Sequence, residues 1–153
     1  MRLSVVDPQR CVGCQCCMFA CARLAGNGGF AGSSIGVRSA GGMRNGFKIV
    51  VCSACSSPAC EAVCPTGALR PRNKGGGVLF DSSKCIGCGH CKDACKIGAV
   101  FWDDENNKPV ICKYCGYCAK YCPYGVIEFD KGDKLKCPNP DTEQSLSEVK
   151  GRS

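Results

Sequence analysis

The chain has 153 residues, 18 of them cysteine, a formal net charge of +7 and an aromatic content of only 7%. Its length suits one ordinary domain, but this composition excludes a large conventional apolar core. The basic residues are scattered among the cysteines and form no patch, which argues against nucleic-acid binding. The sequence also contains no apolar run long enough for a membrane span.

The first ten residues carry neither the apolar segment of a signal peptide nor a twin-arginine pair. A cysteine-rich chain without an export signal is typical of metal binding in a reducing compartment. We therefore expect a cytoplasmic protein, unless a partner with an export signal takes it elsewhere.

Sixteen cysteines form four compact quartets. Three quartets have the spacing C-x2-C-x2-C-x3-C, and the second has C-x2-C-x4-C-x3-C. This spacing is typical of the cysteines that hold cubane iron–sulfur clusters in bacterial ferredoxins, so the sequence predicts four [4Fe–4S] clusters. The quartets are, in chain order, Cys11, Cys14, Cys17 and Cys21; Cys52, Cys55, Cys60 and Cys64; Cys85, Cys88, Cys91 and Cys95; Cys112, Cys115, Cys118 and Cys122.

The x3 step in each quartet predicts that the clusters are paired. It places the third and fourth cysteines at i and i+4 of a helical turn, about 6 Å apart along the helix axis. That rise suits two neighbouring clusters better than one, and in two-cluster ferredoxins the fourth cysteine ligates the other cluster. The spacing alone leaves open which quartets pair with each other.

Short apolar runs flank the quartets and predict short strands in small hairpins. Their repetition predicts an α+β fold of duplicated bacterial ferredoxin-like modules, with short hairpins and short helices around four clusters. These runs lie at residues 47–51, 67–69, 78–81, 98–102, 110–111 and 125–129.

We expect a four-cluster domain over residues 1–137 and an irregular tail over 138–153, which could order on a partner. Residues 26–46, rich in Gly, Ser and Asn, read as a loop insertion with one strand-like run at 35–37. A docking loop and a mobile linker are equal alternatives for this segment.

The clusters change the meaning of the basic charge. An oxidised cubane with four thiolates carries roughly −2, so four clusters add about −8 and leave a net charge near −1. Because metal binding then supplies the free energy that a small apolar core cannot, we expect the cluster-free chain to be largely unfolded.

Several residues beside the quartets have a structural interpretation. Cys16 is expected to be a packed bystander, Cys137 a free thiol, His90 a non-ligand and Lys96 a solvated surface residue. An alternative for Lys96 is that its charge raises a cluster's potential. Four tyrosines near the last quartet are expected to shield its cluster: Tyr114, Tyr117, Tyr121 and Tyr124.

The order of the quartets, the widened second quartet with its Pro65-Thr66-Gly67-Ala68 continuation, and the CIGCGHC run at 85–91 carry a family resemblance. Over roughly residues 11–129 the chain resembles the four-cluster ferredoxin-like subunits of molybdenum and tungsten pterin oxidoreductases. It looks most like the small subunit of tungsten aldehyde oxidoreductase complexes.

The resemblance implies that the first quartet pairs with the fourth and the second with the third. The four implied ligand sets are Cys11, Cys14, Cys17 and Cys122 (cluster 1); Cys112, Cys115, Cys118 and Cys21 (cluster 2); Cys52, Cys55, Cys60 and Cys95 (cluster 3); Cys85, Cys88, Cys91 and Cys64 (cluster 4). Sequential pairing, first with second and third with fourth, is the alternative that spacing does not exclude.

The resemblance further implies a non-catalytic electron-transfer subunit. It would relay single electrons to or from a large catalytic tungsten or molybdenum pterin subunit that oxidises aldehydes. A free polyferredoxin serving several enzymes and a zinc-binding interaction module are the alternatives. Clusters near opposite ends of the chain would also allow copies to stack head to tail.

Overall fold

The computed structural model describes residues 2–41 and 44–130. The expected tail at 138–153 and Cys137 lie outside these residues. In chain order the elements are β1 (Arg2–Val5), the 3-10 helix η1 (Pro8–Arg10), α1 (Cys16–Leu24), β2 (Gly36–Ser39), β3 (Phe47–Val50), α2 (Ala59–Ala62), β4 (Leu69–Pro71), β5 (Val78–Phe80), α3 (His90–Ala94), β6 (Phe101–Asp103), β7 (Lys108–Val110), α4 (Tyr117–Lys120) and β8 (Ile127–Asp130).

The strands form antiparallel pairs: β1 with β8, β2 with β3, β4 with β5, and β6 with β7. The first pair joins the two ends of the described chain, with Leu3 opposite Phe129. The mixed helix and strand character predicted from the sequence is thus confirmed, while the count of four clusters stays a prediction.

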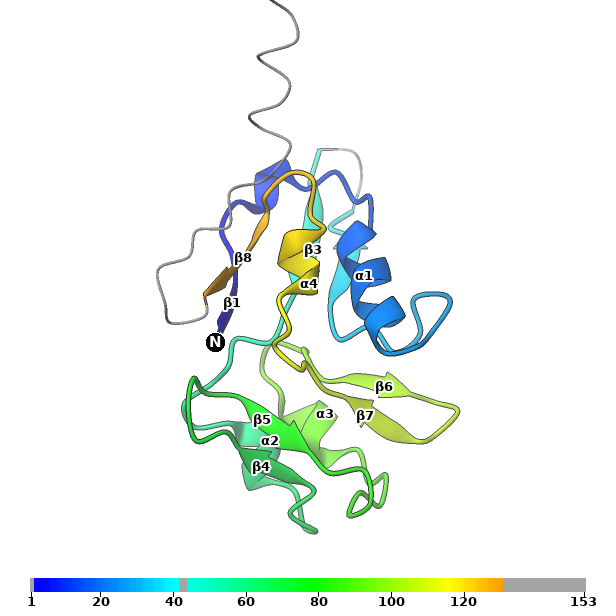
Figure 1. The fold of residues 1–153 in the computed structure, drawn as a ribbon, viewed down its shortest axis with the longest axis vertical. Helices are drawn as coiled ribbons and strands as arrows, with labels where there is room; N and C mark the ends of the chain where they lie inside the picture. The colour runs from blue at the N-terminus through cyan, green and yellow to red at the C-terminus, as the bar shows by residue number, and fades with distance from the viewer. Residues whose placement is uncertain (1, 42–43, 131–153) are drawn as a thin grey trace, which may run out of the picture.

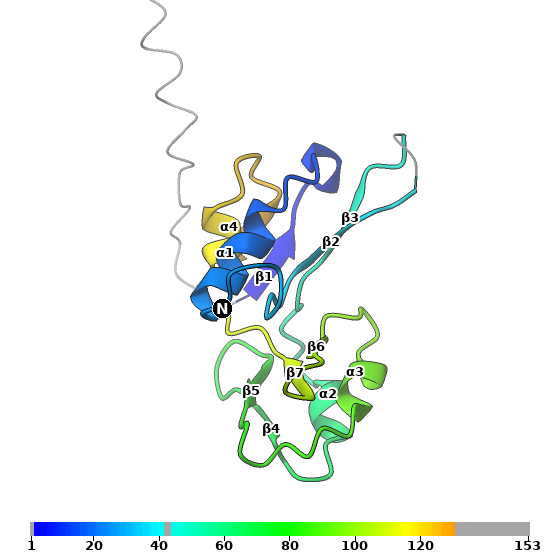
Figure 2. The ribbon, with the colours of Figure 1, turned by 90° about the vertical axis from the view of Figure 1, so that its right-hand side faces the viewer.

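The elements gather in two halves, as Figures 1 and 2 show from perpendicular directions. One half contains α1, α4 and the pairs β1–β8 and β2–β3; the other contains α2, α3 and the pairs β4–β5 and β6–β7. Each half has its own core of buried residues, and cysteines of the quartets belong to both cores. The chain therefore enters the second half after β3 and returns to the first half at α4.

Prolines account for the ends of two helices. They follow Cys64 and Cys122, shortly after α2 and α4 end, and a proline cannot continue a helix. Where Ala22 follows Cys21, α1 continues to Leu24, whereas α3 ends at Ala94 without a proline. Among the described residues, no helix has the length and apolar character that crossing a membrane requires.

The segment read as a loop insertion contributes to the core. It carries β2, and residues 33–37 are all buried. The Val37 N–H lies 3.3 Å from the Met18 Sδ of α1, and a Cβ on Gly36 would come within 2.9 Å of the Phe101 ring of β6. This part of the segment is therefore packed between α1 and the second half.

Candidate iron–sulfur cluster sites

All four quartets share one backbone turn. The second residue inside the first C-x2-C of each quartet has a positive φ: Gly13 at 71°, Ala54 at 52°, Gly87 at 71° and Tyr114 at 53°. Glycine adopts this left-handed conformation without cost, whereas another residue pays roughly 1–2 kcal/mol. The repetition of the turn shows that the quartets are built alike, and Ala54 and Tyr114 occupy it against the local preference.

The third and fourth cysteines follow a second repeated pattern. Cys17 and Cys21 both lie in α1, and in the other quartets the third cysteine lies on a short helix with the fourth at or just beyond its end. Helices α1 and α4 lie beside each other, as do α2 and α3 (Figures 1 and 2). The cysteines of the first and fourth quartets are thereby brought together, as are those of the second and third.

The neighbours of the buried thiols match the implied ligand sets. The pKa of Cys17 is raised to about 12, first by burial and then by the neighbouring thiolates of Cys122, Cys14 and Cys11. The pKa of Cys118 is raised to about 12, first by burial and then by Cys112, Cys21 and Cys115. The pKa of Cys60 is likewise raised to about 11, first by burial and then by Cys52 and Cys95.

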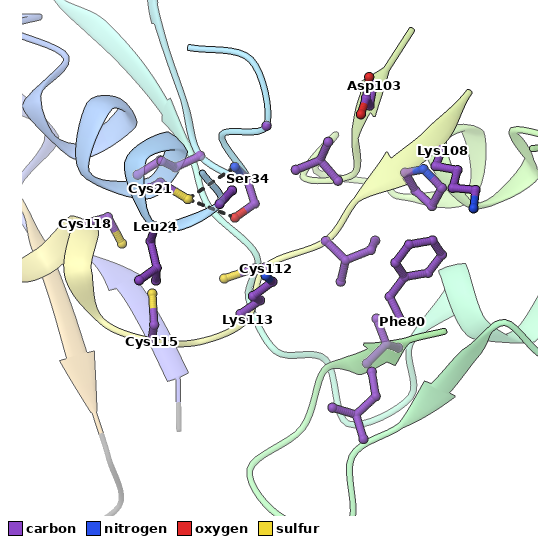
Figure 3. Close-up of a pocket in the computed structure, with 18 of the residues that line it drawn as sticks. Cys21, Leu24, Ser34, Phe80, Asp103, Lys108, Cys112, Lys113, Cys115 and Cys118 are labelled. Carbon is purple, nitrogen blue, oxygen red and sulfur yellow. Dashed lines mark hydrogen bonds between the residues drawn. The ribbon is translucent and has the colours of Figure 1, made fainter. Parts of the chain in front are cut away.

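Three of the implied sets also line one cavity each. Cys21 projects from α1 toward the segment of Cys112, Cys115 and Cys118, and all four line a cavity of about 770 Å³ (Figure 3). The other two sets line smaller cavities. One is lined by Cys11, Cys14, Cys17 and Cys122, and the other by Cys64, Cys85, Cys88 and Cys91. This arrangement supports the implied pairing, which stays a prediction.

Backbone N–H groups point at sulfurs of the quartet cysteines. Ala99 N–H donates to Cys95 Sγ at 3.3 Å, and Val126 N–H donates to Cys122 Sγ at 3.4 Å, in each case four residues after the cysteine. Burial opposes ionisation of Cys64, yet hydrogen bonds from Thr66, Ala68 and Leu69 outweigh it and lower the pKa of that thiol. Donors of this kind stabilise thiolates, so the surroundings suit anionic cluster ligands.

Ser34 provides the donors at Cys21, a role that sequence reasoning missed. Its N–H lies 3.4 Å and its hydroxyl 3.2 Å from Cys21 Sγ, and its side chain is buried (Figure 3). Because α1 continues past Cys21, the chain cannot return a donor from four residues later. Ser34 therefore supplies, from another segment, the hydrogen-bond donors that the fourth cysteines of the other quartets receive from nearby residues.

The donor set fits iron–sulfur clusters by its chemistry: compact groups of thiols, several of them buried, with N–H donors directed at sulfur. Among the described residues, no three His, Cys, Asp or Glu side chains gather closely enough to share one metal ion. In a cubane, by contrast, each thiolate binds a different iron atom. Since the buried thiols have raised pKa values, iron must displace their protons on binding.

One expectation about neighbouring residues is corrected: Cys16 is not packed but exposed, at the first residue of α1. Of the four tyrosines, Tyr114 is buried, and Tyr124 lines the cavity of Cys11, Cys14, Cys17 and Cys122 although it is 41% exposed. Tyr117 and Tyr121 are 40% and 53% exposed, and a shielding role for them stays a prediction. His90 and Lys96 are exposed, in agreement with the surface interpretation of Lys96.

Comparison with known proteins defines the class of the central segment. Residues 51–100 match the family described as a 4Fe-4S dicluster domain. This match covers α2, α3, β4 and β5, and it contains the second and third quartets. The segment is therefore an iron–sulfur domain of the ferredoxin type.

Three relatives extend the likeness beyond this segment. The chain is 32% identical over 108 residues to subunit beta of the NADH-dependent phenylglyoxylate dehydrogenase of Aromatoleum evansii, covering 69% of this chain and 24% of the relative. It is 33% identical over 114 residues to the thiosulfate reductase electron transfer subunit PhsB of Salmonella typhi, covering 71% and 59%.

It is also 33% identical over 119 residues to the probable anaerobic dimethyl sulfoxide reductase chain YnfG of Escherichia coli (strain K12), covering 70% of this chain and 58% of the relative. The chain spans less than two thirds of the length of each of these relatives. Over these stretches the chain is thus similar to subunits of oxidoreductases, one of which is named as an electron transfer subunit.

Proposed function

We propose that the chain is an electron-transfer subunit that relays single electrons through four [4Fe–4S] clusters. The observation that carries this proposal is the gathering of fifteen of the sixteen quartet cysteines into sets. Three sets of four each line a cavity of their own, and in the set of cluster 3 Cys60 has Cys52 and Cys95 as neighbours. Each cluster changes charge by one electron without breaking a bond. The chain supplies spacing, burial and hydrogen bonds around them.

The two halves suggest the direction in which a relay would extend. The implied sets of clusters 1 and 2 lie in the half with α1 and α4. Those of clusters 3 and 4 lie in the half with α2 and α3, except that Cys52 lies at the boundary and packs against the core of the first half. Cys52 and Cys112 are close enough that Cys52 raises the pKa of Cys112, after burial. Clusters 2 and 3 are therefore the neighbours across the boundary, and clusters 1 and 4 are the ends.

The partner in this proposal is a large catalytic subunit with a tungsten or molybdenum pterin that oxidises aldehydes. The family resemblance supports the aldehyde substrate, whereas the similar proteins bear the names of phenylglyoxylate, thiosulfate and dimethyl sulfoxide enzymes. Both lines of support agree on an oxidoreductase complex.

Anaerobic purification of the tagged chain from its native host tests this proposal. We expect one larger subunit to co-purify in constant ratio and to contain tungsten or molybdenum. Adding an aldehyde should reduce the clusters and bleach their visible absorption. Adding thiosulfate or dimethyl sulfoxide should oxidise the reduced clusters and restore the absorption only if the partner is a thiosulfate or dimethyl sulfoxide reductase. Recovery of the loaded chain alone would instead indicate a free polyferredoxin, and four zinc atoms would indicate an interaction module.

A further inference from the structure

Tyr114 lies between two ligand cysteines of the fourth quartet and is almost fully buried, at 2% exposure. It adopts the left-handed turn at φ 53°, where the first and third quartets have glycine. A bulky residue in this conformation persists only when its surroundings hold it there. The side chain must therefore make contacts that offset the cost of the turn.

Two hydrogen bonds connect Tyr114 to ligands on both sides of the boundary. Its N–H donates to Cys112 Sγ at 3.4 Å, and its hydroxyl oxygen lies 2.9 Å from Cys52 Sγ. A cysteine that ligates iron is a thiolate and has no proton to donate. In the loaded protein the Tyr114 hydroxyl must therefore donate to the Cys52 sulfur.

Two neighbours fix the position of this hydroxyl. A Cβ on Gly77 would overlap the Tyr114 hydroxyl, so a glycine is required for this close approach. The Gly77 N–H donates to the Cys55 carbonyl at 3.0 Å, which anchors the glycine to the second quartet. The Arg72 guanidinium lies 4.9 Å from the centre of the Tyr114 ring on the same side of the boundary as Gly77.

We propose that Tyr114 is a positioning residue that raises the reduction potential of the cluster ligated by Cys52 and joins its ligands to those of the cluster ligated by Cys112. This inference rests on the proposed function, because it needs clusters at both cysteines. It does not depend on which quartets pair.

The sign of the effect follows from charge. Reduction adds one negative charge, and part of it resides on the thiolate sulfurs. A hydroxyl that donates to a thiolate stabilises the reduced state more than the oxidised state, which raises the potential. The nearby positive charge of Arg72 acts in the same direction.

The test is an EPR-monitored redox titration of the Tyr114→Phe variant, which keeps the ring and removes only the hydroxyl. The Cys52 cluster is identified as the one whose signal changes in Cys52→Ser. At a fixed applied potential we expect about a tenfold lower ratio of reduced to oxidised Cys52 cluster. This corresponds to a reduction potential lowered by ~59 mV for a one-electron couple, and the potentials of the other clusters should not change. Tyr121→Phe is the matched control, because it removes an exposed hydroxyl from the same quartet.

A second variant changes the position of the Tyr114 hydroxyl by a substitution at Gly77, the residue against which the hydroxyl packs. Gly77→Ala should displace it and lower the same potential, whereas Gly26→Ala adds a methyl group at a similar positive φ in open space, away from this cluster, and should not. An unchanged potential in Tyr114→Phe with full iron content would overturn the inference and leave the proposed function intact. Loss of the cluster from Tyr114→Phe would also overturn it, since the role would then be structural. A wild-type chain without clusters would instead contradict the proposed function itself.

Discussion

Replacing Cys122 with alanine is expected to remove the same EPR signal that is lost when Cys17 is replaced, although these cysteines belong to the last and first quartets. Both line one cavity where α1 lies beside α4, and after burial Cys122 has the largest effect in raising the pKa of Cys17. Replacing Cys118 should remove a different signal, shared with Cys21. Each variant should lose about one cluster, or roughly four iron atoms per chain.

Cys16→Ala is the matched control for these variants, because Cys16 is a cysteine of the same segment but is exposed and outside the quartets. It should retain every signal. If Cys122→Ala and Cys118→Ala lost the same signal, each quartet would hold its own cluster. If Cys122 shared a signal with Cys91 instead, the sequential pairing of the third and fourth quartets would be correct.

Removing the iron is expected to abolish cooperative folding. The core of the first half contains Cys17, Cys112, Cys118 and Cys122 among its buried members, and Cys91 belongs to the core of the second half. Without clusters, these thiols surround space that no large apolar side chain fills, and the remaining cores are too small to offset the entropy of a chain of this length. Metal binding supplies that free energy in the loaded protein.

Thermal unfolding followed by near-UV and far-UV circular dichroism checks this expectation. The loaded protein should show a cooperative transition, and the chelated protein should show none at any temperature. Restoring iron and sulfide anaerobically should restore the transition, which excludes irreversible damage. A chelated chain that kept its near-UV signal and unfolded cooperatively would show that the polypeptide core is sufficient.

Local spacing predicted the features that local geometry controls. The x2 and x3 steps place a turn and then a helical step at each quartet, and the apolar runs that flank the quartets lie in strands such as β5 and β8. The prolines after Cys64 and Cys122 likewise mark where helices must end. These features depend on residues within a few positions of each other, so the sequence expresses them directly.

Long-range contacts were not visible in the sequence. Ser34 reaches Cys21 from a segment that reads as a polar loop, and Tyr114 reaches Cys52 from 62 positions away. No periodicity encodes such contacts; they arise when β2 packs against α1 and when the two halves meet. One local signal was available for Tyr114, because it occupies the position that holds glycine in two other quartets. The exposure of Cys16 was missed because free cysteines are usually buried.

Iron and acid-labile sulfide per chain, measured after anaerobic purification, test the central claim most directly. Four [4Fe–4S] clusters require about 16 iron and about 16 sulfide per chain, with a visible absorption that bleaches on reduction. About 8 of each would restrict the clusters to half of the quartets, such as those in the 4Fe–4S dicluster domain at residues 51–100. About 4 zinc atoms, with neither sulfide nor visible absorption, would contradict an electron-transfer function.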